Sequence, residues 1–96
     1  MDIKELEIFH TIAQERSIKG ASKLLYMTPQ GISKVVKNLE AELECRLFLR
    51  SSQGMALTES GERLLSYAER EIMEYYNMKK DILHIEQCKN RLVDLL

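Results

Sequence analysis

Apolar residues recur every three to four positions along most of this chain, with polar residues between them. This spacing is typical of amphipathic helices, because 3.6 residues complete one turn and the apolar side chains then share one face. The pattern predicts helices over residues 3–14, 18–26 and 28–43, and a long last helix from residue 59. The expected inward residues are Leu6, Phe9, Ile12 and Ala13, with Ile8 beside them, then Ala21, Leu24 and Leu25, and finally Ile32, Val35, Val36, Leu39 and Leu43.

The third of these helices has a clear start and a polar outer face. Thr28 can accept hydrogen bonds from the free N–H groups of the first turn, and Pro29 fits the first helical position. The outer face carries side chains that hydrogen-bond base edges or neutralise phosphates, namely Gln30, Ser33, Lys34, Lys37 and Asn38. An ordinary solvated face has a similar composition, so this helix alone does not decide between DNA binding and simple exposure.

The helix before it favours DNA binding. Ser17 can cap this short helix, and the small residues Gly20 and Ala21 allow another helix to approach closely. Only residues 26–27 separate it from the cap of the next helix, so the two helices should cross at a steep angle. The sequence therefore predicts a helix-turn-helix at about 18–37, whose second helix would lie in a DNA major groove.

Two short apolar runs at 47–50 and 55–58 follow, on either side of Ser-Ser-Gln-Gly. They predict a two-stranded hairpin, with Gly54 supplying an unusual backbone angle at the turn. The hairpin can serve as a wing that contacts DNA, and it can also simply close the core. Arg50 is the strongest expected phosphate contact in it, and the hydroxyl and amide of Ser52 and Gln53 are expected to make weaker ones.

The last helix is predicted to start at the cap Thr58 and to continue to at least Cys88, which makes a rod of about 45 Å. Its apolar stripe is expected to face water in a monomer and to be covered by a second copy of the chain. The residues expected in this dimer contact are Leu65, Ala68, Ile72, Tyr75, Tyr76 and Ile82, with Leu64, Leu83 and Ile85 alongside. Lys79 interrupts the stripe, so an ideal coiled coil is not expected. Alternatively, the helix folds back on its own domain or is covered by a further domain.

Charge is segregated along the chain, although the formal net charge is only −1. Residues 16–38 contain no acidic residue but hold Arg16, Lys19, Lys23, Lys34 and Lys37. Such a local cationic patch still attracts phosphates, since salt screens charges only beyond roughly 8 Å at physiological ionic strength. The low total charge predicts that non-specific DNA binding is modest.

The sequence offers no sign of catalytic, metal or cofactor chemistry. The two cysteines, Cys45 and Cys88, do not have the spacing of metal ligands, and no nucleophile lies beside a base in any known motif. An enzyme is therefore the least expected class. No apolar stretch is long enough to cross a bilayer, and the first residues do not have the layout of a signal peptide. These features predict a soluble cytoplasmic protein without a membrane partner.

Residues 6–9, 17–25, 28–33, 47–50 and 57–61 carry a family resemblance in their order and spacing. The chain resembles the N-terminal DNA-binding region of LysR-type transcriptional regulators up to about residue 65. The resemblance implies a mainly α fold: a winged helix-turn-helix of three helices plus a two-stranded wing over 1–58, then a linker and dimerisation helix over 59–96. It also implies sequence-specific binding of double-stranded DNA by a homodimer, to regulate transcription, with the helix at about 29–43 in the major groove.

Carried over by position, the resemblance puts Thr28, Pro29, Gln30, Ser33, Lys34 and Lys37 at the DNA. The chain departs from the family in two places. It has Thr-Pro-Gln where Ser-Gln-Pro is usual, which displaces the amide by one position. It also has Glu44 where glycine is common, so the third helix is expected to end differently or to continue a little.

Two questions about the role of the chain stay open at this stage. A winged-helix module that binds a protein partner and has little DNA affinity is the alternative function. In the family a ligand-sensing C-terminal domain follows, and it is absent here, so a small-molecule effector would act only through that missing domain. The apolar end at 92–96 is then the severed hinge of a fragment, unless the chain is a natural short protein.

Overall fold

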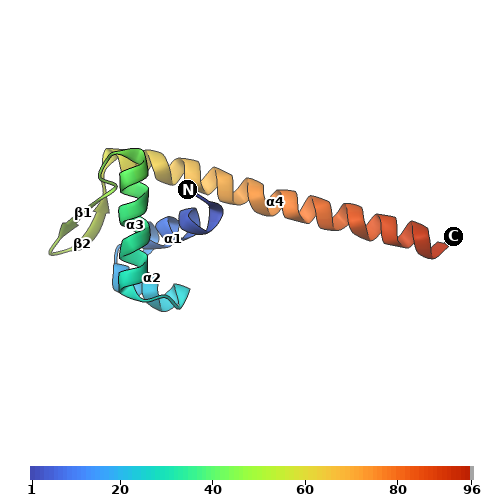
Figure 1. Cartoon of the computed structure of the whole chain (residues 1–96), viewed down its shortest axis with the longest axis horizontal. Coiled ribbons are helices and arrows are strands. Elements are labelled where there is room, and N and C mark those ends of the chain that lie inside the picture. The colour runs from blue at the N-terminus through green and yellow to red at the C-terminus, as the bar shows by residue number, and fades with distance from the viewer. Residues whose placement is uncertain (96) are drawn as a thin grey trace.

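The computed structural model describes the backbone of residues 1–95 and the side chains of residues 1–90. Three helices and a β-hairpin gather at one end of a long helix that projects away from them (Figure 1). The molecule therefore has an elongated outline of 64 × 25 × 20 Å. The expected fold, a mainly helical winged helix-turn-helix followed by a long helix, is confirmed. The hinge expected at 92–96 lies outside the residues whose side chains are described.

Each of the first three helices begins at a polar side chain. These helices are α1 (Ile3–Glu15), α2 (Ile18–Leu25) and α3 (Pro29–Leu43). The caps are Asp2, Ser17 and Thr28, and each accepts a hydrogen bond from the backbone N–H three residues further on. This geometry satisfies an N–H group that has no partner inside the helix. The starts that we expected for α2 and α3 are thus confirmed.

The same three helices end at non-glycine residues in the left-handed conformation. Their φ angles are 55° at Arg16, 54° at Tyr26 and 54° at Glu44. We expected that Glu44 would change the end of α3, but the helix stops at Leu43 and the N–H of Glu44 donates to the carbonyl of Glu40. That expectation was wrong, because a residue with a side chain can adopt this conformation at a cost of about 1–2 kcal/mol.

The wing consists of β1 (Phe48–Ser51) and β2 (Gly54–Leu57), paired antiparallel with Phe48 opposite Leu57. Each strand is shifted by one residue from the expected run, because Leu47 donates its N–H to Glu40 and Thr58 caps the next helix. Gly54 has a φ of 111°, as its place in the turn required. The next N–H in β2, that of Met55, donates to the carbonyl oxygen of Arg16 over 3.0 Å. The hairpin is thereby tied to the joint between α1 and α2.

The core lies where α1, α3, the wing and the start of α4 meet. Phe9 of α1 and Phe48 of β1 are both buried in it, and their rings contact each other at a tilt of 48° with centroids 5.2 Å apart. The fully or nearly fully buried residues include most of those predicted to face inward, namely Leu6, Phe9, Ile12, Ala21, Ile32, Val36 and Leu39, and also Ile8, which was expected only beside that face. Ala13, Leu25 and Val35 are partly buried against this core.

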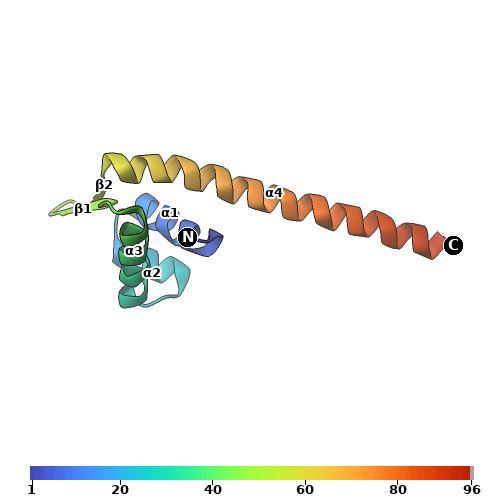
Figure 2. The same cartoon turned by 45° about the horizontal axis from the view of Figure 1, so that its top comes forward.

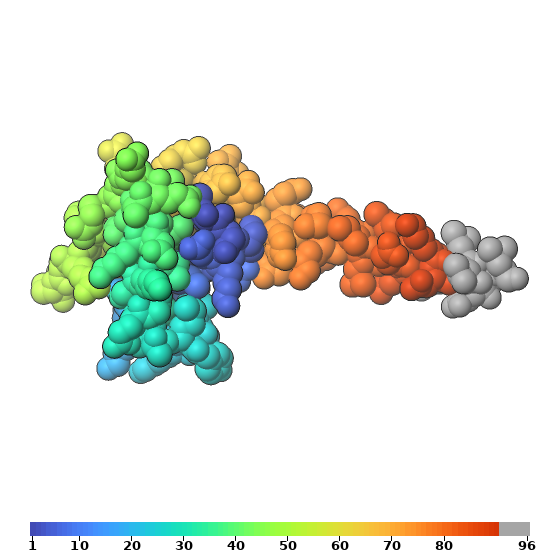
Figure 3. Space-filling view, in the orientation of Figure 1, coloured from blue at the N-terminus to red at the C-terminus, as the bar shows by residue number. Residues whose placement is uncertain are grey.

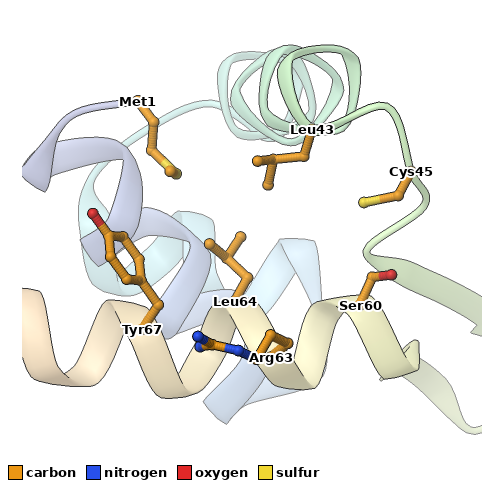
Figure 4. A pocket seen from close by; sticks show the side chains of 7 residues that line it. All are labelled: Met1, Leu43, Cys45, Ser60, Arg63, Leu64 and Tyr67. Carbon is orange, nitrogen blue, oxygen red and sulfur yellow. The ribbon is translucent and has the colours of Figure 1, made fainter.

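Two residues that we expected to face inward are exposed instead. Leu24 is 59% exposed, because α2 is only eight residues long and packs on α1 and α3 through its other side. Leu43 is 38% exposed at the end of α3. It lies in an open hollow of about 400 Å³ whose other residues include Met1, Leu64 and Tyr67 (Figure 4).

Helix α4 (Glu59–Leu95) is 37 residues long and continues past Cys88, the residue to which it was predicted to extend at least. Its first turns pack on α1 (Figures 1 and 2). Within these turns Ala68 is fully buried, and Leu65 and Ile72 are partly buried against the domain's own core. We expected these three residues to face water in a monomer, and for them this was wrong. The apolar stripe starts inside the domain and only then leaves it.

The second half of α4 has no neighbouring element in either view (Figures 1 and 2). Every described side chain from 76 to 90 is exposed. The last tie to the domain is Tyr76, whose hydroxyl donates to Glu7 Oε1 over 2.8 Å, and this bond raises the pKa of Tyr76 above its ordinary value. The first half of α4 thus packs on its own domain, as one alternative expected. The second half leaves its apolar side chains exposed, as the other expected.

Replacing Gly61 with alanine is expected to destabilise the domain by about 1–3 kcal/mol, because the contact between the wing and α4 leaves no room for a side chain at this position. A Cβ at this position would collide with the carbonyl oxygen of Leu47 and lie 2.9 Å from a methyl carbon of Leu57. Denaturant unfolding followed by circular dichroism measures the loss. Gly31→Ala is the matched control, since a Cβ there meets no backbone atom and its nearest neighbour is Thr28 Oγ1 at 3.2 Å. Equal stability of the two variants would contradict the tight joint.

Candidate nucleic-acid interface

The outer face of α3 is open to solvent along its whole length. The side chains of Gln30, Lys34 and Lys37 are exposed, as are Thr28 and Pro29 at the start of the helix. Ser33 is half-buried. Neither the domain nor α4 covers this face, and Figure 3 shows α3 at the surface beside the wing. The side chains expected to contact DNA are thus accessible.

Five of these residues surround a single shallow hollow on α3. Pro29, Gln30, Ser33, Lys34 and Lys37 line it, and its volume is about 410 Å³. Their spacing of one, three and four residues along a helix explains why they share a face. The hollow combines one amide, one hydroxyl and two ammonium groups. Such a set can both hydrogen-bond base edges and neutralise phosphates.

Thr28 has a double capacity at the start of this face. Its Oγ1 accepts the N–H of Gly31 over 3.0 Å, which leaves the hydroxyl hydrogen free to donate outward. The first turn of α3 also carries no acidic residue. The N-terminus of α3 therefore combines a hydroxyl donor with the positive end of the helix dipole.

The wing places Arg50 next to α3. A second hollow of about 110 Å³ lies between them and is lined by Ser33 and Lys37 of α3 and by Arg50 of β1. The structure thus brings together three residues that the sequence had assigned to two separate elements. Ser52 and Gln53 are exposed in the turn of the wing and do not line this hollow.

Two residues of the same hollow were missed from the sequence. Arg46 follows the end of α3, and its Nε lies 3.5 Å from Glu40 Oε2. That same carboxylate oxygen accepts the N–H of Leu47 over 2.8 Å. Glu40 is thereby engaged by its own chain, so it opposes a phosphate less than a free carboxylate would. Arg46 could have been found from its place three residues beyond the predicted helix end.

The cationic residues of 16–38 remain available to an anion. Arg16, Lys19, Lys23, Lys34 and Lys37 are all exposed. Within the part of the chain that the structure describes, none of the five forms an ion pair. The charge segregation read from the sequence therefore corresponds to an accessible cationic surface.

Other kinds of site find little support among the described residues. They contain no group of three or more histidine, cysteine or acidic side chains that could hold a metal ion. None of the helices in this described part of the chain has the length and the apolar character that a membrane span requires.

The residues expected at a dimer contact divide into two groups. Leu65, Ala68 and Ile72 are turned toward the chain's own core, and Tyr75 is half-buried. Tyr76 and Ile82 are exposed, and they share an almost entirely apolar hollow of about 470 Å³ with Lys79, Lys80, Leu83 and Glu86. Leu83 is 60% exposed, and the expected set had placed it only alongside the stripe.

Known proteins that resemble this chain are regulators. Residues 3–62 match the model of the family described as "Bacterial regulatory helix-turn-helix protein, lysR family". The chain is 35% identical over 95 residues to the uncharacterized HTH-type transcriptional regulator YxjO of Bacillus subtilis, covering 99% of this chain and 33% of that protein. It is 41% identical over 70 residues to the regulator YofA of the same organism, covering 73% of this chain and 25% of that protein. The chain thus spans a third or less of these relatives.

Solved structures agree with the family. The DNA-binding domain of BenM in its complex with catB site 1 DNA superposes with a TM-score of 0.85 at 26% identity, covering 88% of this chain and 96% of that one. The complex of the CbnR DNA-binding domain with DNA gives a TM-score of 0.77 at 29% identity, covering 88% and 97%. The family consists of transcriptional regulators and not of enzymes, as the sequence indicated. This chain belongs to the lysR family of bacterial regulatory helix-turn-helix proteins and forms its DNA-binding, winged helix-turn-helix part.

Proposed function

We propose that this chain binds double-stranded DNA sequence-specifically as a homodimer, with α3 in the major groove, to regulate transcription. The observation that carries the proposal is the open face of α3, where an amide and two ammonium groups surround one hollow. An α-helix has the width of a B-DNA major groove, and these side chains suit base edges and phosphates. The BenM and CbnR domains, which share the fold, were solved as complexes with DNA.

The residues of this surface divide into two roles. Gln30, Ser33 and Lys34 read bases, since they line the hollow on the outer face of α3. Thr28, Lys37 and Arg50 hold the phosphate backbone on the two sides of the groove, and Ser52 and Gln53 add weaker contacts from the wing. Pro29 occupies the first position of α3 and sets the start of the helix.

The dimer forms through the uncovered half of α4. Ile82 and Leu83 are 51% and 60% exposed, although isolated aliphatic side chains gain from burial. The hollow that they share with Tyr76 continues the face by which α4 packs on its own domain. A second copy of the helix offers a matching apolar face, and a two-fold dimer presents two recognition helices to successive grooves.

The charges beside this face favour an antiparallel pairing of the two helices. Lys79 and Glu86 lie on the same face, on opposite sides of Ile82 and Leu83. If the two-fold axis passes between Ile82 and Leu83, Lys79 of each copy meets Glu86 of the other. A parallel, in-register pair would instead juxtapose identical charges, which is unfavourable.

The rest of the relatives' length lies outside this chain. A small-molecule effector would act through such a further domain, and not through the residues described here. Because its target is chromosomal DNA, the protein works in the bacterial cytoplasm.

A salt titration of DNA binding tests the proposed function. A duplex recovered from a random pool with this chain is expected to bind with an affinity that falls steeply as salt rises, because each phosphate contact releases a counterion. The two cationic phosphate contacts of each subunit, Lys37 and Arg50, predict a log–log slope of about −4 for the dimer. Fluorescence anisotropy at several salt concentrations measures it. Failure to enrich any duplex, or binding insensitive to salt, would favour the alternative of a protein-interaction module.

A further inference from the structure

We infer that Arg16 and Arg50 together hold one phosphate group of the DNA backbone, at a site between the wing and the start of α2. This inference rests on the proposed function and adds Arg16 to the DNA surface. In the sequence, Arg16 belongs to the cationic stretch 16–38. Its role follows from where the fold places it.

The two arginines come from different elements but line the same hollow. This hollow of about 230 Å³ lies between the joint of α1 and α2 and the wing, and Ser17 and Ser51 also line it. The backbone hydrogen bond from Met55 to the carbonyl of Arg16 holds the two elements together. The site is therefore fixed by the docking of the wing on the joint.

The same hollow is continuous with the proposed DNA face. Arg50, Ile18 and Met55 line both it and the hollow between α3 and the wing. Ser33 and Lys37 in turn line both that hollow and the one on α3. A surface thus runs without a break from Gln30 across the wing to Arg16. A duplex seated on α3 would bring a backbone phosphate to its far end.

The chemistry of the site suits a phosphate group. Guanidinium groups bind phosphates through two parallel hydrogen bonds, and the two free oxygens of a backbone phosphate have enough lone pairs to accept from two guanidinium groups. Ser17 Oγ accepts the N–H of Gly20 over 3.0 Å, so its hydroxyl hydrogen is free to donate. Ser51 contributes less, because its hydroxyl already bonds to the carbonyl of Gly54.

The acidic residue next to Arg16 in the sequence does not line the hollow. Glu15 precedes Arg16, and its carboxylate lies over Gly20 in the first turn of α2. It is not among the residues that line the site. Among the described residues neither Arg16 nor Arg50 has an ion-pair partner. Both guanidinium groups are therefore available.

The left-handed backbone at Arg16 provides a clean substitution. Its φ of 55° is one that glycine adopts without strain, so Arg16→Gly removes the side chain and leaves the fold at least as stable. Arg16→Lys keeps a charge but loses the paired hydrogen bonds. Arg70→Gln, on an exposed position of α4 far from the hollow, is the matched control for loss of one cation.

A double-mutant cycle on the selected duplex tests the shared site. Arg16→Gly and Arg50→Gln are each expected to weaken binding about tenfold, and the double variant much less than a hundredfold, because both arginines serve one phosphate. Arg16→Lys should fall between wild type and Arg16→Gly, and Arg70→Gln should bind like wild type. The salt slope of the double variant should be smaller by about one per subunit.

Three outcomes would overturn this inference, and they differ from failure of the proposed function. Wild-type affinity for Arg16→Gly would exclude a contact, and strictly multiplicative losses would exclude a shared phosphate. Weaker binding with an unchanged salt slope in the double variant would indicate a structural effect. If the wild-type chain itself shows no salt-dependent binding to any duplex, the proposed function fails and this site falls with it.

Discussion

Leu83→Glu is expected to convert the protein from a dimer to a monomer and to lower its affinity for a two-half-site duplex by a hundredfold or more. Leu83 is 60% exposed in the single chain, so a charge there does not disturb the domain itself. In the proposed dimer it would be buried against the partner helix, where an unpaired carboxylate is costly. Loss of the second recognition helix removes the gain from bivalent binding, which is typically 10²–10⁴-fold. Light scattering coupled to size exclusion measures the mass, and anisotropy measures the affinity.

Ile85 provides a control two residues away. It is 51% exposed, and it does not line the apolar hollow that contains Leu83. Ile85→Glu should therefore remain a dimer with wild-type affinity. If Ile85→Glu dissociates the protein and Leu83→Glu does not, the dimer uses another side of α4.

The antiparallel pairing has its own test in the same assay. Lys79→Glu should weaken the dimer, because it would face Glu86 of the partner helix, and adding Glu86→Lys should restore it. In a parallel pair each of these residues would meet its own copy, so Lys79→Glu would exchange one like-charge pair for another. An unweakened dimer in the single variant would thus argue for the parallel arrangement.

Local signals in the sequence predicted most of the fold. Caps at Ser17 and Thr28 determined where α2 and α3 begin, and the residue spacing predicted most of the buried set. These features depend on side chains within one or two turns of each other. Gly54 was likewise identified from the turn that contains it, and its φ of 111° agrees.

The predictions failed where the outcome depends on residues distant in sequence. The spacing of Ala68 placed it on the apolar stripe of the last helix. Only the packing of α4 on α1 shows that the chain's own domain covers this residue. Leu24 is exposed because no further element covers that side of α2. The hollow shared by Arg16 and Arg50 exists because the wing contacts the joint between α1 and α2. The two arginines are 34 residues apart in the sequence, so no local pattern could predict that they line the same hollow.

Gln30→Ala is expected to change which DNA sequence the protein prefers. Gln30 is exposed at the second position of α3 and lines the hollow on its outer face. A glutamine amide can make two hydrogen bonds to adenine in the major groove, so its removal should cost about 1–3 kcal/mol at one base pair of each half-site. Selection from random duplexes, followed by sequencing, should show that base pair relaxed at two symmetric positions.

Lys37→Ala distinguishes base reading from simple attraction. Lys37 lines the hollow between α3 and the wing, where a phosphate contact is proposed. Its loss should weaken binding to all sequences alike and reduce the salt slope, while the selected site stays the same. Recovery of one identical site with wild type and Gln30→Ala would show that Gln30 does not read a base. The displaced amide of Thr-Pro-Gln would then face the DNA backbone, and Ser33 and Lys34 would be the residues of α3 that discriminate between base pairs.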